Sequence, residues 1–397
     1  MSGNQSGDVL VLGAGVVGLG IAFTLARAGH PVTVVDPAPA SGATHAAAGM
    51  IAPVAELAHQ EEALLPLTLD SARRYRGFVD DVAAVSGRDA GYATTPTLVC
   101  GFDAADRDAL AALYRVQLRL GLDVEQLTTR EARRREPLLG PHLTAAYLLP
   151  HDHQVDPRVL SRALLAALEA LGVRVIAQRA EALLSTPAGS GTSGSSGGRV
   201  AGARLADGST VEADETIVAT GVAADLPGLP APLPLRPVHG DVLRLRPPAG
   251  FPALTHTVRA IVRGVPVYVV PRFDGTLVLG ATAREDGGSG LQAGGVHTLL
   301  RDGITLLPAL AEATITDAVA RARPGTPDNM PLLGRMRDAD GAAVAGLVLA
   351  TGFFRHGVLL TPLAGAAVRG LLVGDPLPVA EPCDPDRFAL IPRATAP

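Results

Sequence analysis

The chain opens with short apolar runs separated by glycines, a pattern typical of a strand, a turn and a helix. Residues 8–13 form a short apolar run that ends in glycine, as buried parallel strands often do. Residues 16–28 have the apolar spacing of a helix that stops before Gly29, and residues 32–35 form a second apolar run. The pattern therefore predicts a β-α-β unit at the start of the chain.

Further along, the periodicity predicts more helices and a strand-rich stretch. Helical spacing recurs at residues 61–85, 107–120, 128–136, 156–171 and 357–372. Buried strands are predicted at 173–176, 216–219 and 347–350, and a hairpin at 199–213, around Asp207-Gly208. Between residues 235 and 280 the chain is rich in short β-like runs, at 241–245, 265–270 and 276–279. Residues 185–198 are almost all small and polar, which predicts a flexible loop.

These elements predict an α/β fold in two parts. One part is a Rossmann-type dinucleotide-binding domain assembled from residues 1–88, 150–228 and 322–397. The other is an inserted α+β domain for the substrate, residues 89–149 and 229–321, built on a mostly antiparallel sheet. At 397 residues with 47% hydrophobic residues, the chain is long and apolar enough for two such domains.

Composition narrows the chemistry, because all 34 basic residues are arginines and the chain has no lysine. Schiff-base chemistry through a lysine is therefore excluded. A site that binds a carboxylate has to use Arg, His or neutral donors, and the planar guanidinium of Arg matches a carboxylate with two parallel hydrogen bonds. The net charge of −5 gives no basic patch for nucleic acid and no electrostatic reason for membrane binding.

Other classes of site receive little support. Cys100 and Cys383 lie far apart and form no CxxC motif, so we expect two ordinary thiols and no metal site. The first seven residues are polar and lack the basic start of a signal peptide, which predicts a cytoplasmic protein.

The turn after the first strand carries the motif Gly13-Ala14-Gly15-Val16-Val17-Gly18. This GxGxxG motif is weak alone, but here a strand precedes it, a helix follows it, and Asp36 ends the next strand. In such units the glycines allow a tight turn and close approach to a pyrophosphate, whose charge faces the helix N-terminus. Asp36 stands where a carboxylate accepts hydrogen bonds from ribose. The context predicts a dinucleotide site.

A second cluster of small residues decides between the possible dinucleotides. Residues 41–50, from Ser41 to Met50, contain two glycines and four alanines and permit close backbone approach to a bulky planar ligand. A regular NAD-binding domain continues with β-α-β units instead. Residues 217–221, ending in Thr220-Gly221, resemble a later strand-plus-glycine motif of two-domain flavoproteins. FAD is therefore favoured over NAD.

Three further motifs lie along the chain. The first is HAAAGMIAP at residues 45–53, followed by Glu56; the second is RPGTPDN at 323–329, and the third is TGFFRHGVLLTP at 351–362. These motifs resemble segments of the D-amino-acid-oxidase-like flavoproteins, and in particular of their glycine oxidase branch from thiamine biosynthesis; the third is similar to the family's TGHxRxGxLLxP segment. Residues 267–272, with Tyr268, resemble the family's tyrosine-bearing strand. The resemblance spans nearly the whole chain in the right order.

The resemblance implies roles for individual residues. Arg323 would bind the substrate carboxylate, Tyr268 would donate a second hydrogen bond to it, and Arg355 would lie beside the substrate, its backbone carbonyl accepting from the amine. Backbone amides around Gly357 would face the pyrimidine ring of the flavin. The predicted FAD-contacting residues are Gly13, Gly15, Val16, Val17, Gly18, Asp36, Pro37, Ala43, Thr44, Ala48, Gly49, Met50, Glu181, Gly221, Gly352, Phe353, Phe354, Arg355, His356, Gly357, Val358 and Leu359.

We expect the FAD to be bound without a covalent link. Some related sarcosine and dimethylglycine enzymes attach FAD through a histidine in the loop that holds His45, but their histidine is followed by a shorter run before the glycine. Attachment through cysteine is excluded because the segment around Arg323 has no Cys.

The resemblance implies FAD-dependent oxidative deamination of glycine or of small amines and D-amino acids such as sarcosine and D-proline. Molecular oxygen would be the acceptor, with an oxo acid, ammonia and hydrogen peroxide as products and the imine supplied to the thiazole of thiamine. A homo-oligomer is implied as well. The alternatives are a D-amino acid dehydrogenase or sarcosine oxidase of the same family, a non-catalytic FAD-binding or tRNA-modifying protein, and an NAD-dependent dehydrogenase.

Overall fold

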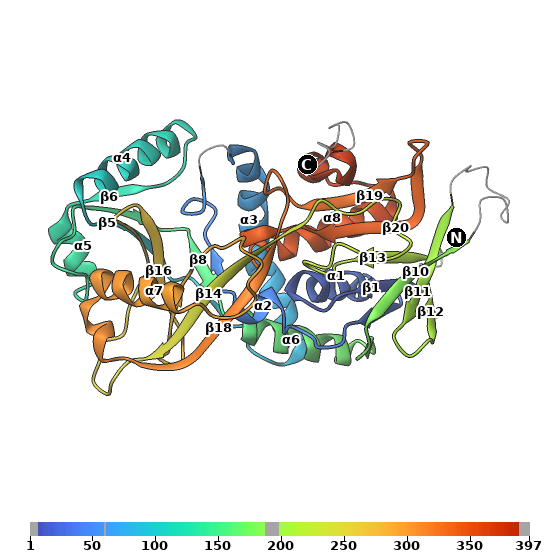
Figure 1. Cartoon of the computed structure of the whole chain (residues 1–397), viewed down its shortest axis with the longest axis horizontal. Coiled ribbons are helices and arrows are strands. Elements are labelled where there is room, and N and C mark those ends of the chain that lie inside the picture. Colours follow the sequence, from blue (N-terminus) through green and yellow to red (C-terminus); the bar gives the residue numbers. More distant parts are fainter. Residues whose placement is uncertain (1–6, 59–60, 187–197, 389–397) are drawn as a thin grey trace.

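The computed structural model describes residues 7–58, 61–186 and 198–388. Most of the loop predicted at 185–198 lies outside the described residues. The described chain forms two large sheets side by side, each with helices packed against it (Figure 1), and a small third sheet of β3 (Met50–Ile51), β8 (His153–Val155) and β4 (Tyr92–Ala93). The predicted fold class is confirmed.

The first large sheet has a parallel centre that contains the β-α-β unit. Its order is β10-β11-β20-β13-β1-β2-β9, with β12 beside β11 and β19 beside β20. The bounds are β1 (Val9–Leu12), β2 (Val32–Val35), β9 (Arg174–Ile176), β10 (Ala180–Thr186), β11 (Arg199–Leu205), β12 (Thr210–Glu212), β13 (Glu215–Val218), β19 (Leu332–Arg337) and β20 (Ala343–Thr351). Strands β9, β2, β1, β13 and β20 pair in parallel.

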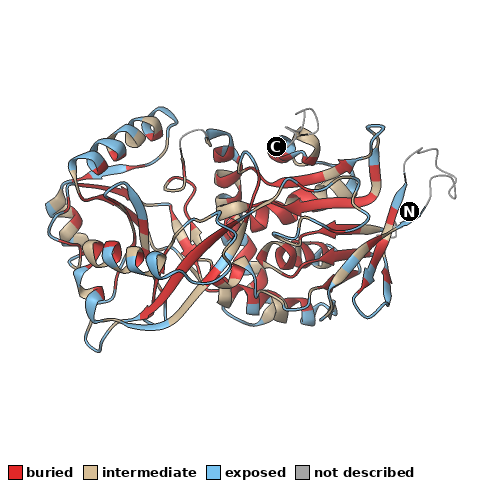
Figure 2. Ribbon diagram, viewed as in Figure 1, coloured by how far each residue is buried: buried red, intermediate tan, exposed pale blue. Residues whose placement is uncertain are grey.

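Side chains of β1 alternate between two hydrophobic clusters, as the period of a strand requires. Val9 and Val11 pack with the helices α1 (Val16–Arg27), α3 (Leu65–Ser86), α6 (Pro157–Ala170) and α8 (Thr361–Val373). Leu10 and Leu12 pack on the opposite face with residues of β11. Burial on both faces explains why β1 is apolar throughout. The buried central strands are coloured red in Figure 2.

The second large sheet is mostly antiparallel, as predicted. Its order is β18-β14-β17-β16-β15-β5-β7-β6, and only the β15–β5 pair of the described sheet is parallel. The bounds are β5 (Thr97–Gly101), β6 (Glu125–Leu127), β7 (Ala145–Leu149), β14 (Arg236–Arg246), β15 (Thr257–Val262), β16 (Val265–Pro271), β17 (Leu277–Gly280) and β18 (Thr314–Gly325). Apart from the end of β18, the two sheets draw on residues assigned to different domains; those domain boundaries stay a prediction.

The two faces of this second sheet differ in character. Val258, Val267 and Leu279 pack on one face with residues of α7 (Ala293–Leu306). On the other face Tyr268 and Val270 lie in a small cluster that includes Ala48 and Met50 of the first part. The second face is therefore turned toward the predicted flavin-binding segments.

Several predicted helix boundaries were wrong. The helix predicted at 357–372 begins at Thr361, because residues 357–360, which follow the 3-10 helix η3 (Phe354–His356), form a turn. The helix predicted at 61–85 begins at Leu65 after η1 (Glu62–Leu64). Helix α7 was not predicted. The other elements are α2 (Ala43–Ala46), α4 (Ala104–Arg119), α5 (Thr129–Arg135), η2 (Pro308–Glu312), η4 (Pro378–Cys383) and η5 (Pro385–Phe388).

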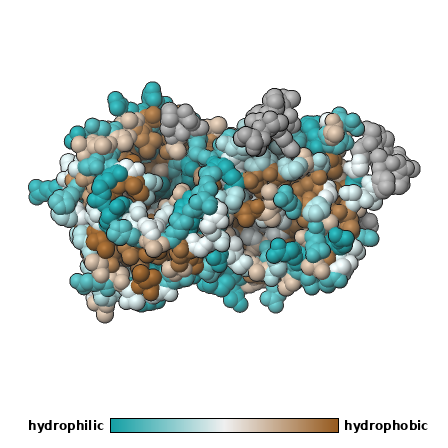
Figure 3. Space-filling view, in the orientation of Figure 1, coloured by the Kyte–Doolittle hydropathy of each residue, from teal (hydrophilic) through white to brown (hydrophobic). Residues whose placement is uncertain are grey.

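The surface view in Figure 3 shows hydrophobic and hydrophilic residues interspersed over one face of the molecule. In the part of the chain that the structure describes, no single helix is long and apolar enough to cross a bilayer. The bent pair Thr361–Val373 and Pro378–Phe388, with 99° between its members, meets the length and composition criterion jointly.

Candidate active site

The glycine-rich turn joins β1 to α1 in the geometry expected for a dinucleotide site. Gly13 has φ +105°, and a Cβ there would overlap the backbone of Ala219. Gly15 is the N-cap of α1 and provides no side-chain cap, so it leaves the helix N-terminus open to a ligand. A Cβ on Gly18 would overlap the carbonyl of Gly13, so the third glycine allows the tight turn.

Asp36 and Thr44 fix the segments around this turn. Asp36 follows β2, and its carboxylate accepts from the backbone N–H groups of Ala14 and Ala38, each at 2.7 Å. A carboxylate has about four acceptor positions, which leaves capacity for hydroxyl groups of a ligand. The Thr44 hydroxyl accepts from the Val16 N–H at 3.0 Å, so the loop containing residues 43–50 is held against the start of α1.

The segment 352–359 reaches the same place from the other end of the chain. A Cβ on Gly357 would lie 3.8 Å from the Val17 side chain, which places this segment beside the start of α1. The Tyr75 hydroxyl donates to the Val358 carbonyl at 3.1 Å, and Thr351 Oγ1 donates to the Gly221 carbonyl at 2.7 Å. The structure therefore brings together the turn at 13–18, Asp36, residues 43–50, Gly221 and residues 352–359. These residues fit a bound dinucleotide.

Glu181 does not join this group. It is exposed on β10, which β11, β20 and β13 separate from β1.

Arg323 and Tyr268 lie on the face of the second sheet that is turned toward Ala48 and Met50. Arg323, in β18, is half-buried, and its Nη1 donates to the Thr282 carbonyl at 3.2 Å. Among the described residues it has no carboxylate partner within salt-bridge distance, and the Tyr268 hydroxyl makes no hydrogen bond. Burial raises the pKa of Tyr268 while the charge of Arg323 acts in the opposite direction, so the two groups are near one another. They leave hydrogen-bond donors free at the interface of the two parts.

Arg355 has a different environment, because two acidic side chains hold its guanidinium. Its Nε donates to Glu56 at 3.0 Å, and its terminal nitrogens pair with Glu61. Glu56 also pairs with Arg259 of β15, whose Nη1 lies 3.4 Å from the sulfur of Met50. We call Arg259, Glu56, Arg355 and Glu61 the charge network.

The charge network keeps Glu56 ionised. Burial alone would raise the pKa of this carboxyl, but the positive charges of Arg259 and Arg355 outweigh burial and hold the pKa at about 2. Phe354 lies next to the charge network, and the guanidinium of Arg355 is 5.3 Å from the centroid of its ring. The φ of Phe354 is +46°, which is unusual for a residue with a side chain.

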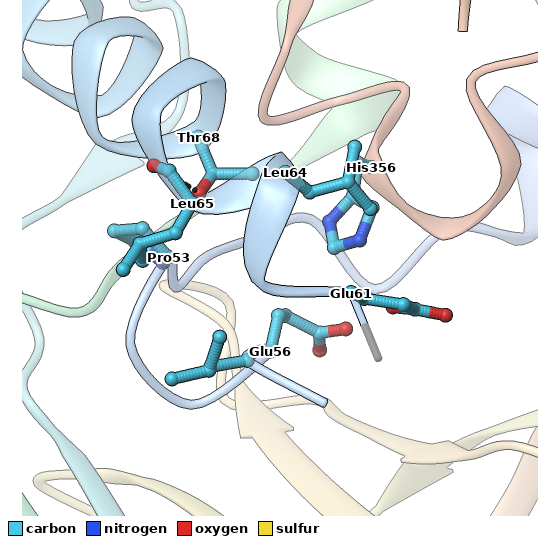
Figure 4. A pocket seen from close by; sticks show the side chains of 8 residues that line it. Pro53, Glu56, Glu61, Leu64, Leu65, Thr68 and His356 are labelled. Carbon is cyan, nitrogen blue, oxygen red and sulfur yellow. Dashed lines mark hydrogen bonds between the residues drawn. The ribbon is translucent and has the colours of Figure 1, made fainter. Parts of the chain in front are cut away.

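His356 lines a small pocket beside the charge network (Figure 4). The pocket is lined by Glu56, Glu61 and His356, and by Pro53, Leu57, Leu64, Leu65 and Thr68. His356 is 3% exposed, and neither ring nitrogen has a hydrogen-bond partner among the described residues. Burial lowers the pKa of His356 to about 4, so its ring is neutral at physiological pH.

Sequence reasoning missed Arg259 and Glu61. Arg259 carries a weak signal, because it is the only charged residue within the otherwise apolar strand 258–262. Glu61 was assigned to a helix and carries no local signal, since its partners Asn329 and Arg355 lie 268 and 294 residues away in sequence. Cys100 and Cys383 are buried and unpaired, and burial raises the pKa of each thiol to about 12.

The fold and this arrangement define a dinucleotide-dependent enzyme with a second, arginine-lined sheet over the cofactor segments. Residues 8–371 match the model of the family described as FAD dependent oxidoreductase, and the chain belongs to this family. FAD as the cofactor and the predicted family resemblance are confirmed. FAD supplies a two-electron acceptor in such enzymes.

Individual known proteins are similar to this chain over most of its length. The bifunctional protein ThiO/ThiG of Trichormus variabilis is 32% identical over 384 residues, which cover 93% of this chain and 54% of that protein. The chain thus spans about half the length of that relative. The glycine oxidase of Bacillus licheniformis is 29% identical over 93% of this chain and 94% of its own. The crystal structure of glycine oxidase from Geobacillus kaustophilus superposes with a TM-score of 0.84 at 29% identity, covering 97% and 99%.

Proposed function

We propose that this chain oxidises glycine and other small amino acids or amines, including sarcosine and D-proline, to the imine. The observation that carries the proposal is the guanidinium of Arg323, which has no acidic partner among the described residues and lies near the unbonded hydroxyl of Tyr268. A planar guanidinium without an internal acidic partner is suited to a carboxylate. The similarity to the named glycine oxidases supports the same choice of substrate.

In this proposal the protein binds and orients the substrate. Arg323 pairs with the substrate carboxylate, and Tyr268 donates a second hydrogen bond to it. The backbone carbonyl of Arg355 accepts from the amine, and Ala48 and Met50 bound the opposite side. FAD, when bound by the segments around residues 13–18, 43–50 and 352–359, would supply a two-electron acceptor for the hydride of the substrate Cα–H bond, and oxygen would reoxidise it with release of hydrogen peroxide. No side chain is needed as a general base, since the neutral amine supplies the electron pair for the C=N bond.

The imine formed from glycine hydrolyses to glyoxylate and ammonia unless another enzyme takes it. The similarity to a protein named ThiO/ThiG supports use of this imine in making the thiazole of thiamine. A D-amino acid dehydrogenase or a sarcosine oxidase is the alternative, because either substrate carries the same carboxylate.

The test is to record the visible spectrum of the purified protein and to add glycine, sarcosine, D-alanine and D-proline separately without oxygen. The proposal predicts a flavin spectrum that bleaches fastest at low glycine concentration, with peroxide formed when air is admitted. Bleaching only with larger D-amino acids, or bleaching without peroxide, would favour the alternative. A protein that no amine bleaches would contradict oxidation of amines.

A further inference from the structure

Two glycines on neighbouring strands lie directly beneath the proposed carboxylate-binding side chains. Gly240 is in β14 and Gly280 in β17, and both are buried. Neither has a positive φ, so backbone conformation does not explain why glycine stands there. Glycine within a strand lowers its stability and often marks close approach of another group.

At both positions the approaching group belongs to the carboxylate-binding pair. A Cβ on Gly280 would come closer than 3.0 Å to the hydroxyl and ring of Tyr268. A Cβ on Gly240 would lie 2.5–2.8 Å from three atoms of the Arg323 guanidinium. Real Cβ atoms essentially never approach other atoms this closely, so either substitution forces the side chain above it to move.

Strand register places all four residues on one face. Tyr268 is paired with Gly280, and Gly280 with Val242, so Gly240 faces the same side two residues along β14. Arg323 is four residues from Val319, which is paired with Val242, and therefore faces this side too. The phenol and the guanidinium thus lie against bare backbone on the face turned toward Ala48 and Met50.

We propose that Gly240 and Gly280 are positioning residues for carboxylate recognition. Because Gly240 and Gly280 have no side chains, the side chains of Arg323 and Tyr268 lie flat on the sheet. Their hydrogen-bond donors are then at a distance from the sheet that leaves room for a small carboxylate between them and residues 48–50. The inference rests on the proposed roles of Arg323 and Tyr268. Displacing a donor by about 1 Å is enough to lose a hydrogen bond, whose optimal length range is only about 0.5 Å wide.

The experiment compares Gly280→Ala, Tyr268→Ala and the double variant Gly280→Ala/Tyr268→Ala as FAD-loaded proteins. Binding of acetate, which has the carboxylate but no amine to oxidise, is followed by the change in flavin absorbance, and KM and kcat are measured with glycine. The matched control is Gly303→Ala. Its Cβ would press on Leu279, the residue next to Gly280 that faces the other side of the sheet, and would not touch Tyr268.

We expect Gly280→Ala to weaken acetate binding and raise the KM for glycine by about 10-fold, the effect of losing the hydrogen bond from Tyr268 to a charged group. The double variant should bind acetate no more weakly than Tyr268→Ala, because the clash is gone once the phenol is removed. Gly303→Ala should bind acetate like the wild type. If Gly280→Ala fails to fold, the double variant should fold and restore FAD binding.

The proposal is overturned if Gly280→Ala binds acetate like the wild type, or if Gly303→Ala loses as much acetate affinity as Gly280→Ala. It is also overturned if the loss of acetate affinity in the double variant equals the sum of the losses in the two single variants. A double variant that also fails to fold would overturn it as well. Failure of the proposed function is a separate outcome, because wild-type protein that binds acetate but never oxidises glycine leaves the acetate comparison intact.

Discussion

Two arginines at the same interface, Arg323 and Arg355, have opposite electrostatic surroundings. Arg355 is 25% exposed and is paired with both Glu56 and Glu61. Arg323 donates to a backbone carbonyl and has no acidic partner among the described residues. The resemblance to known enzymes assigned both residues to the substrate site. In the structure only the guanidinium of Arg355 is paired with acidic side chains.

The difference shows which guanidinium is available to an anion. Drawing a carboxylate to Arg355 would set it against two acidic side chains already in place, and like charges at close range are unfavourable. At Arg323 the positive charge is uncompensated, so a substrate carboxylate completes a pair instead of competing for one. The structure therefore leaves the guanidinium of Arg323, and not that of Arg355, available to the carboxylate of the proposed substrate.

The largest effect on stability is expected from breaking the charge network. Glu56→Gln keeps the shape of the side chain but leaves Arg259 and Arg355 without their shared carboxylate, which is 11% exposed. Removing one partner of a buried ion pair typically costs about 3 kcal/mol or more. Urea denaturation should show this loss, whereas Glu285→Gln, at a carboxylate that is 52% exposed, should cost less than about 1 kcal/mol. Equal losses would contradict the distinction.

A smaller effect is expected from the pH dependence of His356. Burial lowers its pKa from 6.5 to about 4 in the folded protein, so the unfolded chain binds the proton more readily as the pH falls from 6.5 to 4. The contribution of His356 to stability is unaffected above this window and declines within it. His356→Asn should therefore gain about 2 kcal/mol relative to the wild type between pH 7.5 and pH 5. The check is urea denaturation of both proteins at the two pH values. A pH-independent difference would show that this ring is protonated normally.

The smallest effect is expected from the Tyr268 hydroxyl. Tyr268→Phe removes one donor from the proposed carboxylate site and leaves the ring in place, so the KM for glycine should rise about 10-fold with little change in kcat. Tyr147→Phe, at a buried tyrosine of the same sheet that faces another cluster, is the control and should leave KM unchanged. Similar steady-state constants for both variants and the wild type would remove Tyr268 from the site.

Local patterns predicted the parts of the fold that depend on neighbours in sequence. The β-α-β unit and its glycine turn were predictable because their spacing, caps and apolar runs lie within residues 8–36. Helix α7 was not, since Gly294 and Gly295 at its start weaken the helical signal. The start of α8 was placed too early because residues 357–360 form a turn, and their apolar side chains do not distinguish that turn from the first turn of a helix.

Residues of the candidate site could be predicted only where they belong to a sequence motif. Arg323 and Tyr268 stand in segments that resemble a known family, whereas the pairing of Arg259 with Glu56 joins residues 203 positions apart. Such a contact is created by the sheet order and leaves no spacing in the sequence. Glu181 was assigned to the cofactor, yet it lies exposed on an edge strand. The roles of Gly240 and Gly280 likewise depend on which side chain lies above each one.

The most direct test of the central claim is to measure acetate binding by Arg323→Met and Arg321→Met. Both residues are on β18 and face the same side of the sheet, but Arg321 is exposed and donates to the Ser41 carbonyl at 2.9 Å. We predict that Arg323→Met keeps FAD and binds acetate about 100-fold more weakly, while Arg321→Met binds it like the wild type. Wild-type affinity in Arg323→Met, or an equal loss in both variants, would contradict the assignment of Arg323 as the carboxylate-binding residue.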